Sequence, residues 1–109
     1  MTRVVITKKN NQITSIECDG HTGYGVEGED IVCSALSSIV QTAVLGLFSV
    51  AGVNVSLVRD ETRGYLKATL PENMTEEQMH DSQVILATMQ LGICDLREGF
   101  SDFIELEVK

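Results

Sequence analysis

The chain opens with two short runs of apolar and β-branched residues, a composition typical of β-strands. These runs occupy residues 2–9 and 12–19, and Asn10 and Asn11 lie between them. Asparagine tolerates the positive φ angles of a tight turn, so the two runs predict a β-hairpin.

Later segments in which apolar residues alternate with polar ones predict three more strands. Residues 53–60 and 63–70 alternate on either side of Glu61-Thr62 and predict a second hairpin. Residues 101–108 contain a similar alternation and predict a last strand, with one face turned toward a core.

Two longer segments have the spacing of apolar residues that is typical of helices. Asp30 fits a helix N-cap, and a broad apolar stripe follows it to about Ala51. A stripe this broad predicts a helix that is buried on much of its circumference. Thr75 and Gln78 fit a capping box, and a second amphipathic helix follows them to about Arg97.

The predicted order of elements is ββαββαβ, within a single domain of residues 1–109. Short links between strands favour antiparallel pairs, and the two helices must cover an apolar face of the sheet. We therefore expect an α+β sandwich of one mainly antiparallel sheet with two helices. The segment 20–30 contains four glycines and no periodicity, so it predicts a mobile loop.

Composition and charge narrow the functional classes. The chain is 43% hydrophobic and 22% charged, which is ordinary for a soluble globular protein. A net charge of -8 argues against direct binding of nucleic acid, because phosphate contacts need a basic surface. The chain begins without the apolar core of a secretory signal, and polar residues interrupt its most apolar run. We therefore expect a cytoplasmic protein without a membrane partner.

The cysteine and histidine content argues against a disulfide framework or a zinc site. Three cysteines is an odd number, and in the cytoplasm they should be reduced. We interpret Cys18 in a strand and Cys94 in a helix as packing residues. Two histidines at distant positions do not make a zinc site, so we expect no metal and no other cofactor.

Cys33 is the residue best placed for chemistry. With Asp30 as N-cap, Cys33 is the third residue of the helix, where unpaired N–H groups and the helix dipole stabilise a thiolate. The same N–H groups could hold an oxyanion. Glu27 and Glu29 oppose the thiolate, and a protonated imidazole would counter them. His21, which the glycine-rich loop joins to Cys33, could supply that imidazole.

Each candidate also has an ordinary structural interpretation. Cys33 could be a small packing residue at the head of an apolar helix, and His21 could be an exposed turn residue. Ser37 lies one helical turn after Cys33 and could bind substrate or only pack. Tyr24 could contact substrate or anchor the loop.

Two motifs occupy the loop and the start of the helix. Residues 20–25 read Gly-His-Thr-Gly-Tyr-Gly, and residues 28–35 read Gly-Glu-Asp-Ile-Val-Cys-Ser-Ala, with Ser37 shortly after. In this order, and with this layout of elements, they resemble the bacterial ribosomal-processing cysteine proteases of the Prp family, once known as YsxB-like proteins. The resemblance covers essentially the whole chain.

The resemblance implies a cysteine endopeptidase that supports ribosome assembly. Members of the family remove the N-terminal extension of a large-subunit ribosomal protein, the one numbered twenty-seven. The resemblance places the nucleophile on Cys33, the catalytic histidine on His21, and the motif's aspartate and serine on Asp30 and Ser37. It also implies a homodimer. The sequence does not reveal the dimer surface, for which the sheet face without helices is the obvious candidate.

These expectations combine into one mechanism. His21 takes the proton of the Cys33 thiol, the thiolate attacks the scissile carbonyl, and water later releases the acyl-enzyme. Gly20, Gly23 and Tyr24 help to shape the substrate site as the loop closes. Because only a flexible loop joins the pair, we expect substrate to assemble it. The alternatives are a non-catalytic ribosome-associated binding module, a thiol redox sensor and a hydrolase of another acyl bond.

Overall fold

The computed structural model describes residues 1–26 and 30–109, which form five strands and two helices. The order ββαββαβ and the α+β class are as predicted. The elements are β1 (Thr2–Lys9), β2 (Gln12–Asp19), α1 (Ile31–Ser49), β3 (Ser56–Asp60), β4 (Tyr65–Thr69), α2 (Glu76–Gly99) and β5 (Ile104–Val108).

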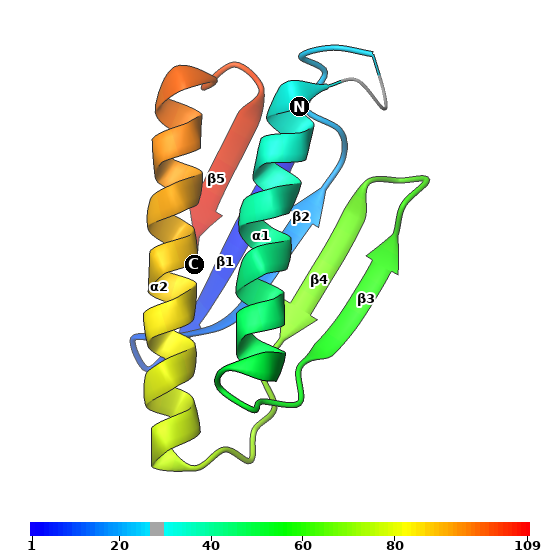
Figure 1. Ribbon diagram of the computed structural model, residues 1–109. Helices are drawn as coiled ribbons and strands as arrows, with labels where there is room; N and C mark the ends of the chain where they lie inside the picture. Colours follow the sequence, from blue (N-terminus) through cyan, green and yellow to red (C-terminus); the bar gives the residue numbers. More distant parts are fainter. Residues whose placement is uncertain (27–29) are drawn as a thin grey trace.

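The strands form one mixed sheet in the order β3-β4-β2-β1-β5 (Figure 1). The pairs β1–β2, β2–β4 and β3–β4 are antiparallel, whereas β1–β5 is parallel. The expectation of a mainly antiparallel sheet is therefore confirmed. Both helices lie on the same face of the sheet, so the fold has two layers (Figure 1).

The turn of the first hairpin confirms the role of its two asparagines. Asn10 has φ 53° and Asn11 has φ 66°, both in the left-handed region. Positive φ at both central residues matches the right-handed twist of the flanking strands. This turn joins β1 to β2, the strand that leads directly into the glycine-rich loop.

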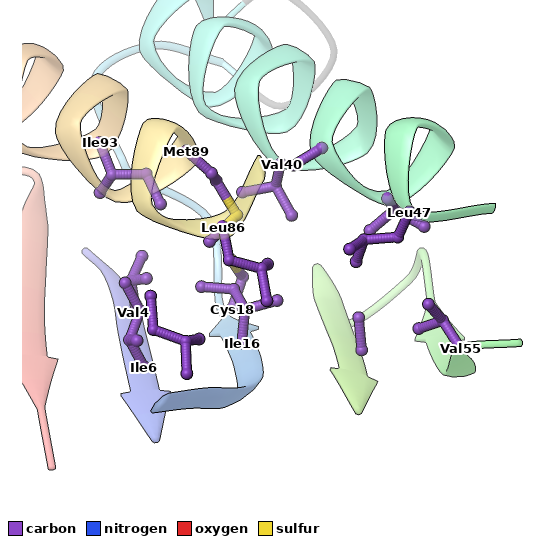
Figure 2. Packing of buried hydrophobic residues seen from close by; sticks show 14 of the residues in the cluster. Val4, Ile6, Ile16, Cys18, Val40, Leu47, Val55, Leu86, Met89 and Ile93 are labelled. Atoms are coloured by element: carbon purple, nitrogen blue, oxygen red, sulfur yellow. The ribbon is translucent and has the colours of Figure 1, made fainter. Parts of the chain in front are cut away.

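The core lies between the sheet and the helix layer. Side chains of β1 and β2 point toward side chains of both helices (Figure 2). Burying them removes apolar surface from water and supplies most of the favourable free energy of folding. The fully or almost fully buried members include Val4, Ile6, Ile16, Val40, Leu47, Leu86, Met89 and Ile93.

The two helices approach closely through a reciprocal pair of contacts. A Cβ atom at Gly46 of α1 would lie 3.5 Å from Cδ1 of Ile85 on α2. A Cβ atom at Gly92 of α2 would lie 3.3 Å from Cγ2 of Ile39 on α1. On each helix, a glycine therefore packs against an isoleucine of the other helix. This interlocking fixes the position of α1 along α2, and with it the position of the first turn of α1.

The predicted strand at residues 53–60 is shorter than expected. β3 begins at Ser56, although Val53 and Val55 are both buried. The N–H of Val53 donates to the carbonyl oxygen of Leu47 at 2.8 Å, so it completes the end of α1 instead of a strand ladder. Alternation in this segment correctly indicated burial but not strand pairing.

α1 is less deeply buried than its broad apolar stripe predicts. Its buried residues are Val32, Leu36, Val40, Ala43, Val44 and Leu47, whereas Ile31, Leu45 and Phe48 are exposed. By length and composition alone α1 could cross a membrane, with mean hydropathy 1.9 over the tested window. One such helix is weak evidence for a membrane span, because the core helix of a soluble protein meets the same criteria.

Candidate active site

Cys33 lies in the first turn of α1, as predicted. Asp30 is the N-cap, and its Oδ1 accepts a hydrogen bond from the N–H of Cys33 at 2.9 Å. Cys33 is half-buried and lines a cleft. Its thiol therefore lies at the N-terminus of a helix and borders the cleft.

The cleft has a volume of about 230 Å³ and lies between α1 and the part of the sheet formed by β2, β4 and β3. Cys33, Ser37 and Gln41 line it from one face of α1, because they are four residues apart. Gly20 and His21 line it from the loop after β2. The other lining residues are Thr2, Cys18, Leu36, Val40, Arg59, Asp60, Glu61, Gly64, Tyr65 and Leu66.

The structure brings His21 and Cys33 to one place. Both line this cleft, and both also line a second, adjoining hollow together with Ser37. Gly23 lines the second hollow and has φ 75°, while Gly20 lines the first and has φ 92°. An imidazole and a thiol from separate elements therefore border the same cleft.

Asp30 binds the loop to the helix. Its side chain is buried, and Oδ2 accepts hydrogen bonds from Oγ1 of Thr22 at 2.5 Å and from the N–H groups of Tyr24 at 3.0 Å and Gly25 at 3.2 Å. Burial raises the pKa of this carboxyl, but the hydrogen bonds from Thr22, Cys33, Gly25 and Tyr24 outweigh burial and lower the pKa to about 2. An ionised Asp30 therefore holds the loop against the first turn of α1.

This ionised carboxylate predicts a pH dependence of stability. The pKa of Asp30 is about 2 in the fold against an ordinary value of 3.8, so its charge stabilises the fold above the ordinary value. That stabilisation is lost as the pH falls from about 4 to about 2. We expect urea denaturation to show this decline, and a smaller one in Asp30→Asn. Equal pH slopes in the two proteins would contradict the role of Asp30.

The same contacts alter the expected oxyanion donors. The N–H of Cys33 donates to the Asp30 side chain, and the N–H of Ser34 donates to the Asp30 carbonyl oxygen at 3.0 Å. An oxyanion could therefore use the N–H of Cys33 only in competition with a carboxylate. Among the contacts of residues 1–26 and 30–109, the N–H groups of Ile31 and Val32 donate no such hydrogen bond.

Tyr24 anchors the loop to the C-terminal end of α2. Its ring packs edge-to-face against Phe100, with centroids 5.4 Å apart, and against Phe103, with centroids 5.2 Å apart. Phe100 is the C-cap of α2, and Phe103 precedes β5. Of the two roles that the sequence left open for Tyr24, anchoring is the one that these contacts support.

Replacing Tyr24 with alanine should loosen this anchor. Each of the two aromatic pairs contributes about 0.5–1.5 kcal/mol beyond its buried area, so we expect the free energy of unfolding to fall by roughly 1–3 kcal/mol. Urea denaturation would measure the change. Tyr24→Phe keeps both ring contacts and should remain close to the wild type. If Tyr24→Phe were as destabilising as Tyr24→Ala, the ring contacts would not be the cause.

The other two cysteines are poorly suited to be nucleophiles. All three cysteines lie in the described part of the chain, and none forms a disulfide. Cys18 lines the same cleft, but burial, assisted by the charge of Glu17, raises the pKa of its thiol to about 12. Cys94 is half-buried in α2 and is absent from the described residues that line the cleft. Of the three cysteines, Cys33 is therefore the one whose half-buried thiol is best placed to react with a molecule in the cleft.

One wall of the cleft was not predicted from the sequence. The hairpin of β3 and β4 contributes Arg59, Asp60, Glu61, Gly64 and Tyr65. These residues reach the site because β4 pairs with β2, a long-range contact that alternation cannot indicate. β4 begins at Tyr65 and not at residue 63 as predicted, because Gly64 has φ 70° and belongs to the turn. A glycine inside a predicted strand was the available signal for a close approach of the backbone.

One part of the predicted site cannot be placed in the structure. Glu27, Gly28 and Glu29, which include two residues of the second motif, lie outside the described residues. Within residues 1–26 and 30–109, no group of three histidine, cysteine, aspartate or glutamate side chains could hold a metal ion.

Known proteins resemble this chain in sequence and in fold. The family model described as cysteine protease Prp matches residues 1–105. The ribosomal processing cysteine protease Prp of Bacillus subtilis is 27% identical over 90 residues, which cover 83% of this chain and 80% of that protein. The crystal structure of SMU.848 from Streptococcus mutans has 31% identity and a TM-score of 0.86, covering 99% of this chain and 93% of that one.

A further solved structure contains a peptide. It is an essential ribosomal processing protease Prp from S. aureus, in complex with a covalently linked product peptide. It superposes with a TM-score of 0.88 at 25% sequence identity, and the match covers 100% of both chains.

Proposed function

Because the chain belongs to the Prp family of cysteine proteases, we propose that it removes the N-terminal extension of a large-subunit ribosomal protein, the one numbered twenty-seven. That the chain is a cysteine protease follows from the family. The ribosomal substrate is proposed from relatives named ribosomal processing cysteine proteases. The observation that carries the proposal is the meeting of His21 and Cys33 at one cleft.

In the proposed mechanism, His21 accepts the proton of the Cys33 thiol. The thiolate attacks the scissile carbonyl carbon, and the tetrahedral intermediate collapses when His21 protonates the leaving amine. A water molecule, deprotonated by His21, then attacks the thioester and releases the acid product. The first-turn amides of Ile31 and Val32 are the proposed donors to the oxyanion. Asp30 acts through the loop, by holding it at the start of α1.

The charge of the protein suits a ribosomal-protein substrate. The net charge is -8, and Asp60 and Glu61 lie on the wall of the cleft opposite α1. Ribosomal proteins carry basic segments that contact RNA, and an acidic surface attracts such a segment and speeds its association. This charge makes direct binding of nucleic acid unfavourable, so we propose the protein, and not its RNA, as the partner.

We also propose that the protein acts as a homodimer in the cytoplasm. The face of the sheet without helices carries charged pairs such as Arg3 with Glu107, at 2.7 Å, so it is less apolar than a stable interface requires. The helix layer instead exposes Leu45, Val84 and Leu91. These residues favour the helix layer over the sheet face as the dimer surface.

A cleavage experiment tests the proposed function. The protein is incubated with a peptide that carries the extended N-terminus of the ribosomal protein, and with a scrambled peptide of the same composition. Mass spectrometry should find one internal cut in the first peptide and none in the second. Binding without any cut would favour a non-catalytic module. Equal cleavage of both peptides would contradict a specific ribosomal substrate and would indicate a general peptidase.

A further inference from the structure

We infer that Gly64, in the turn between β3 and β4, positions the imidazole of His21 for catalysis. The inference rests on the proposed role of His21 as the base. A Cβ atom at Gly64 would lie 3.0 Å from Cε1 and 3.1 Å from Nε2 of the His21 ring. It would also lie 3.0 Å from the carbonyl oxygen of Gly20. The backbone of the turn therefore forms a wall directly against the imidazole.

Glycine is required here for two separable reasons. The φ angle of 70° at Gly64 lies in the left-handed region, which most L-residues avoid. Independently, a side chain of any size would displace either the His21 ring or the backbone of Gly20. The positive φ angle affects only the conformation of the turn, whereas the steric contact affects the position of the His21 ring.

The turn is held firmly against the strand that leads to His21. The N–H of Gly20 donates to the carbonyl oxygen of Gly64 at 3.0 Å. The guanidinium of Arg63 donates two hydrogen bonds to the carboxylate of Asp19, at 3.1 Å and 2.8 Å. Arg63 also lies 4.4 Å from the centroid of the Tyr65 ring. A paired guanidinium and carboxylate fix direction as well as distance, so this pair supports the backbone hydrogen bond between the turn and the start of the loop.

Such a wall restricts where the imidazole can lie. His21 follows directly on Gly20, and both residues and Gly64 line the cleft that contains Cys33. Thr2 adds a second constraint, because its hydroxyl donates to the Gly20 carbonyl oxygen at 3.1 Å. The loop before α1 is thus fixed at its first residues from two sides. Ordering the base before substrate binds lowers the entropic cost of reaching the transition state.

The experiment compares substitutions at two glycines with the same backbone conformation. Gly52 has φ 66°, and a Cβ atom there would meet no described atom within 4 Å. Gly64→Ala and Gly52→Ala therefore introduce similar backbone strain, but only Gly64→Ala places an atom against His21. Gly64→Asn is the second test variant, because asparagine accepts positive φ, as Asn10 does in this protein.

We expect both Gly64 variants to lower kcat for peptide cleavage by about 100-fold, the usual effect of misplacing a reacting group by about 1 Å, with a smaller change in KM. Gly52→Ala should keep the wild-type kcat. The rate of Cys33 alkylation by iodoacetamide should fall in the same pattern. The NMR resonance of the His21 ring Cε1–H should move in the Gly64 variants and stay in place in Gly52→Ala, provided that circular dichroism shows the variants folded.

The outcomes separate this inference from the proposed function. If Gly64→Ala and Gly52→Ala have the same kcat and leave the His21 resonance in place, Gly64 does not position the base. If Gly64→Asn recovers the wild-type kcat, backbone strain and not the contact explains the loss, and the inference fails. If His21→Ala cleaves as fast as the wild type, the proposed base is wrong. The resonance then still reports whether Gly64 places the ring.

Discussion

Replacing Cys33 with alanine should abolish peptide cleavage, lowering kcat by about 10⁴-fold or more, because loss of a nucleophile removes the covalent route entirely. Cys18 cannot take over, since burial holds the pKa of its thiol at about 12. The variant should still bind the peptide, because it loses only one sulfur atom from the cleft wall. Cleavage is measured by mass spectrometry under single-turnover conditions, and binding by calorimetry.

Cys94→Ala is the matched control for this experiment. It removes an equal atom from a half-buried cysteine that is outside the described lining of the cleft, so the cleavage rate should not change. His21→Ala should resemble Cys33→Ala in its loss of cleavage and in its retained binding. Cleavage that survives in Cys33→Ala would show that Cys33 is not the nucleophile. A redox sensor would instead show reversible oxidation of Cys33 and no cut peptide in the wild type.

The second large effect is expected at Asp30. Asp30→Ala removes the acceptor of four hydrogen bonds at once, from the hydroxyl of Thr22 and the N–H groups of Tyr24, Gly25 and Cys33. Loss of a helix N-cap costs about 1 kcal/mol, and each part-buried donor left unsatisfied adds about 1 kcal/mol or more. We therefore expect the free energy of unfolding to fall by roughly 4 kcal/mol. Cleavage should fall as well, since the loop that carries the base is released.

Two variants separate the cap from the loop anchor. Thr75→Ala removes the N-cap of α2, which belongs to a capping box far from the cleft, so it should cost about 1 kcal/mol and leave cleavage unchanged. Asp30→Asn keeps one oxygen for the N–H of Cys33 but turns an N–H₂ group toward donors of the loop. It should retain the cap and still lose activity. If Asp30→Ala lowered the free energy of unfolding and the cleavage rate no more than Thr75→Ala, Asp30 would act only as a helix cap.

Features that depend on neighbouring residues were predictable from the sequence. The side chain of Asp30 caps α1 through Cys33, and Thr75 with Gln78 forms the predicted capping box. Asn10 has the positive φ that the hairpin requires. In each case the deciding interaction spans only a few residues, so the residue types alone carry the information.

Features that depend on distant pairing were not predictable. Gly64 meets His21 because Asp19 pairs with Tyr65 across β2 and β4, and no pattern within either strand sets that register. The hydrogen bond from the N–H of Cys33 to the side chain of Asp30 was predicted, because Asp30 fits a helix N-cap. Its second consequence, the loss of that N–H as an oxyanion donor, follows from the geometry of the first turn. From the sequence, only the family resemblance indicated that His21 acts together with Cys33. In the structure, both residues line the same cleft.

The parallel pairing of β1 with β5 has a consequence for the timing of activity during synthesis. The N–H of Thr2 donates to the carbonyl oxygen of Phe103 at 3.0 Å, and the hydroxyl of the same threonine holds Gly20 beside the histidine. Tyr24 likewise rests on Phe100 and Phe103, in a segment translated after every residue of the cleft. A nascent chain that has not yet released this segment from the ribosome lacks the supports of its own loop. We therefore expect the loop that carries His21 to gain these supports only after β5 has been translated.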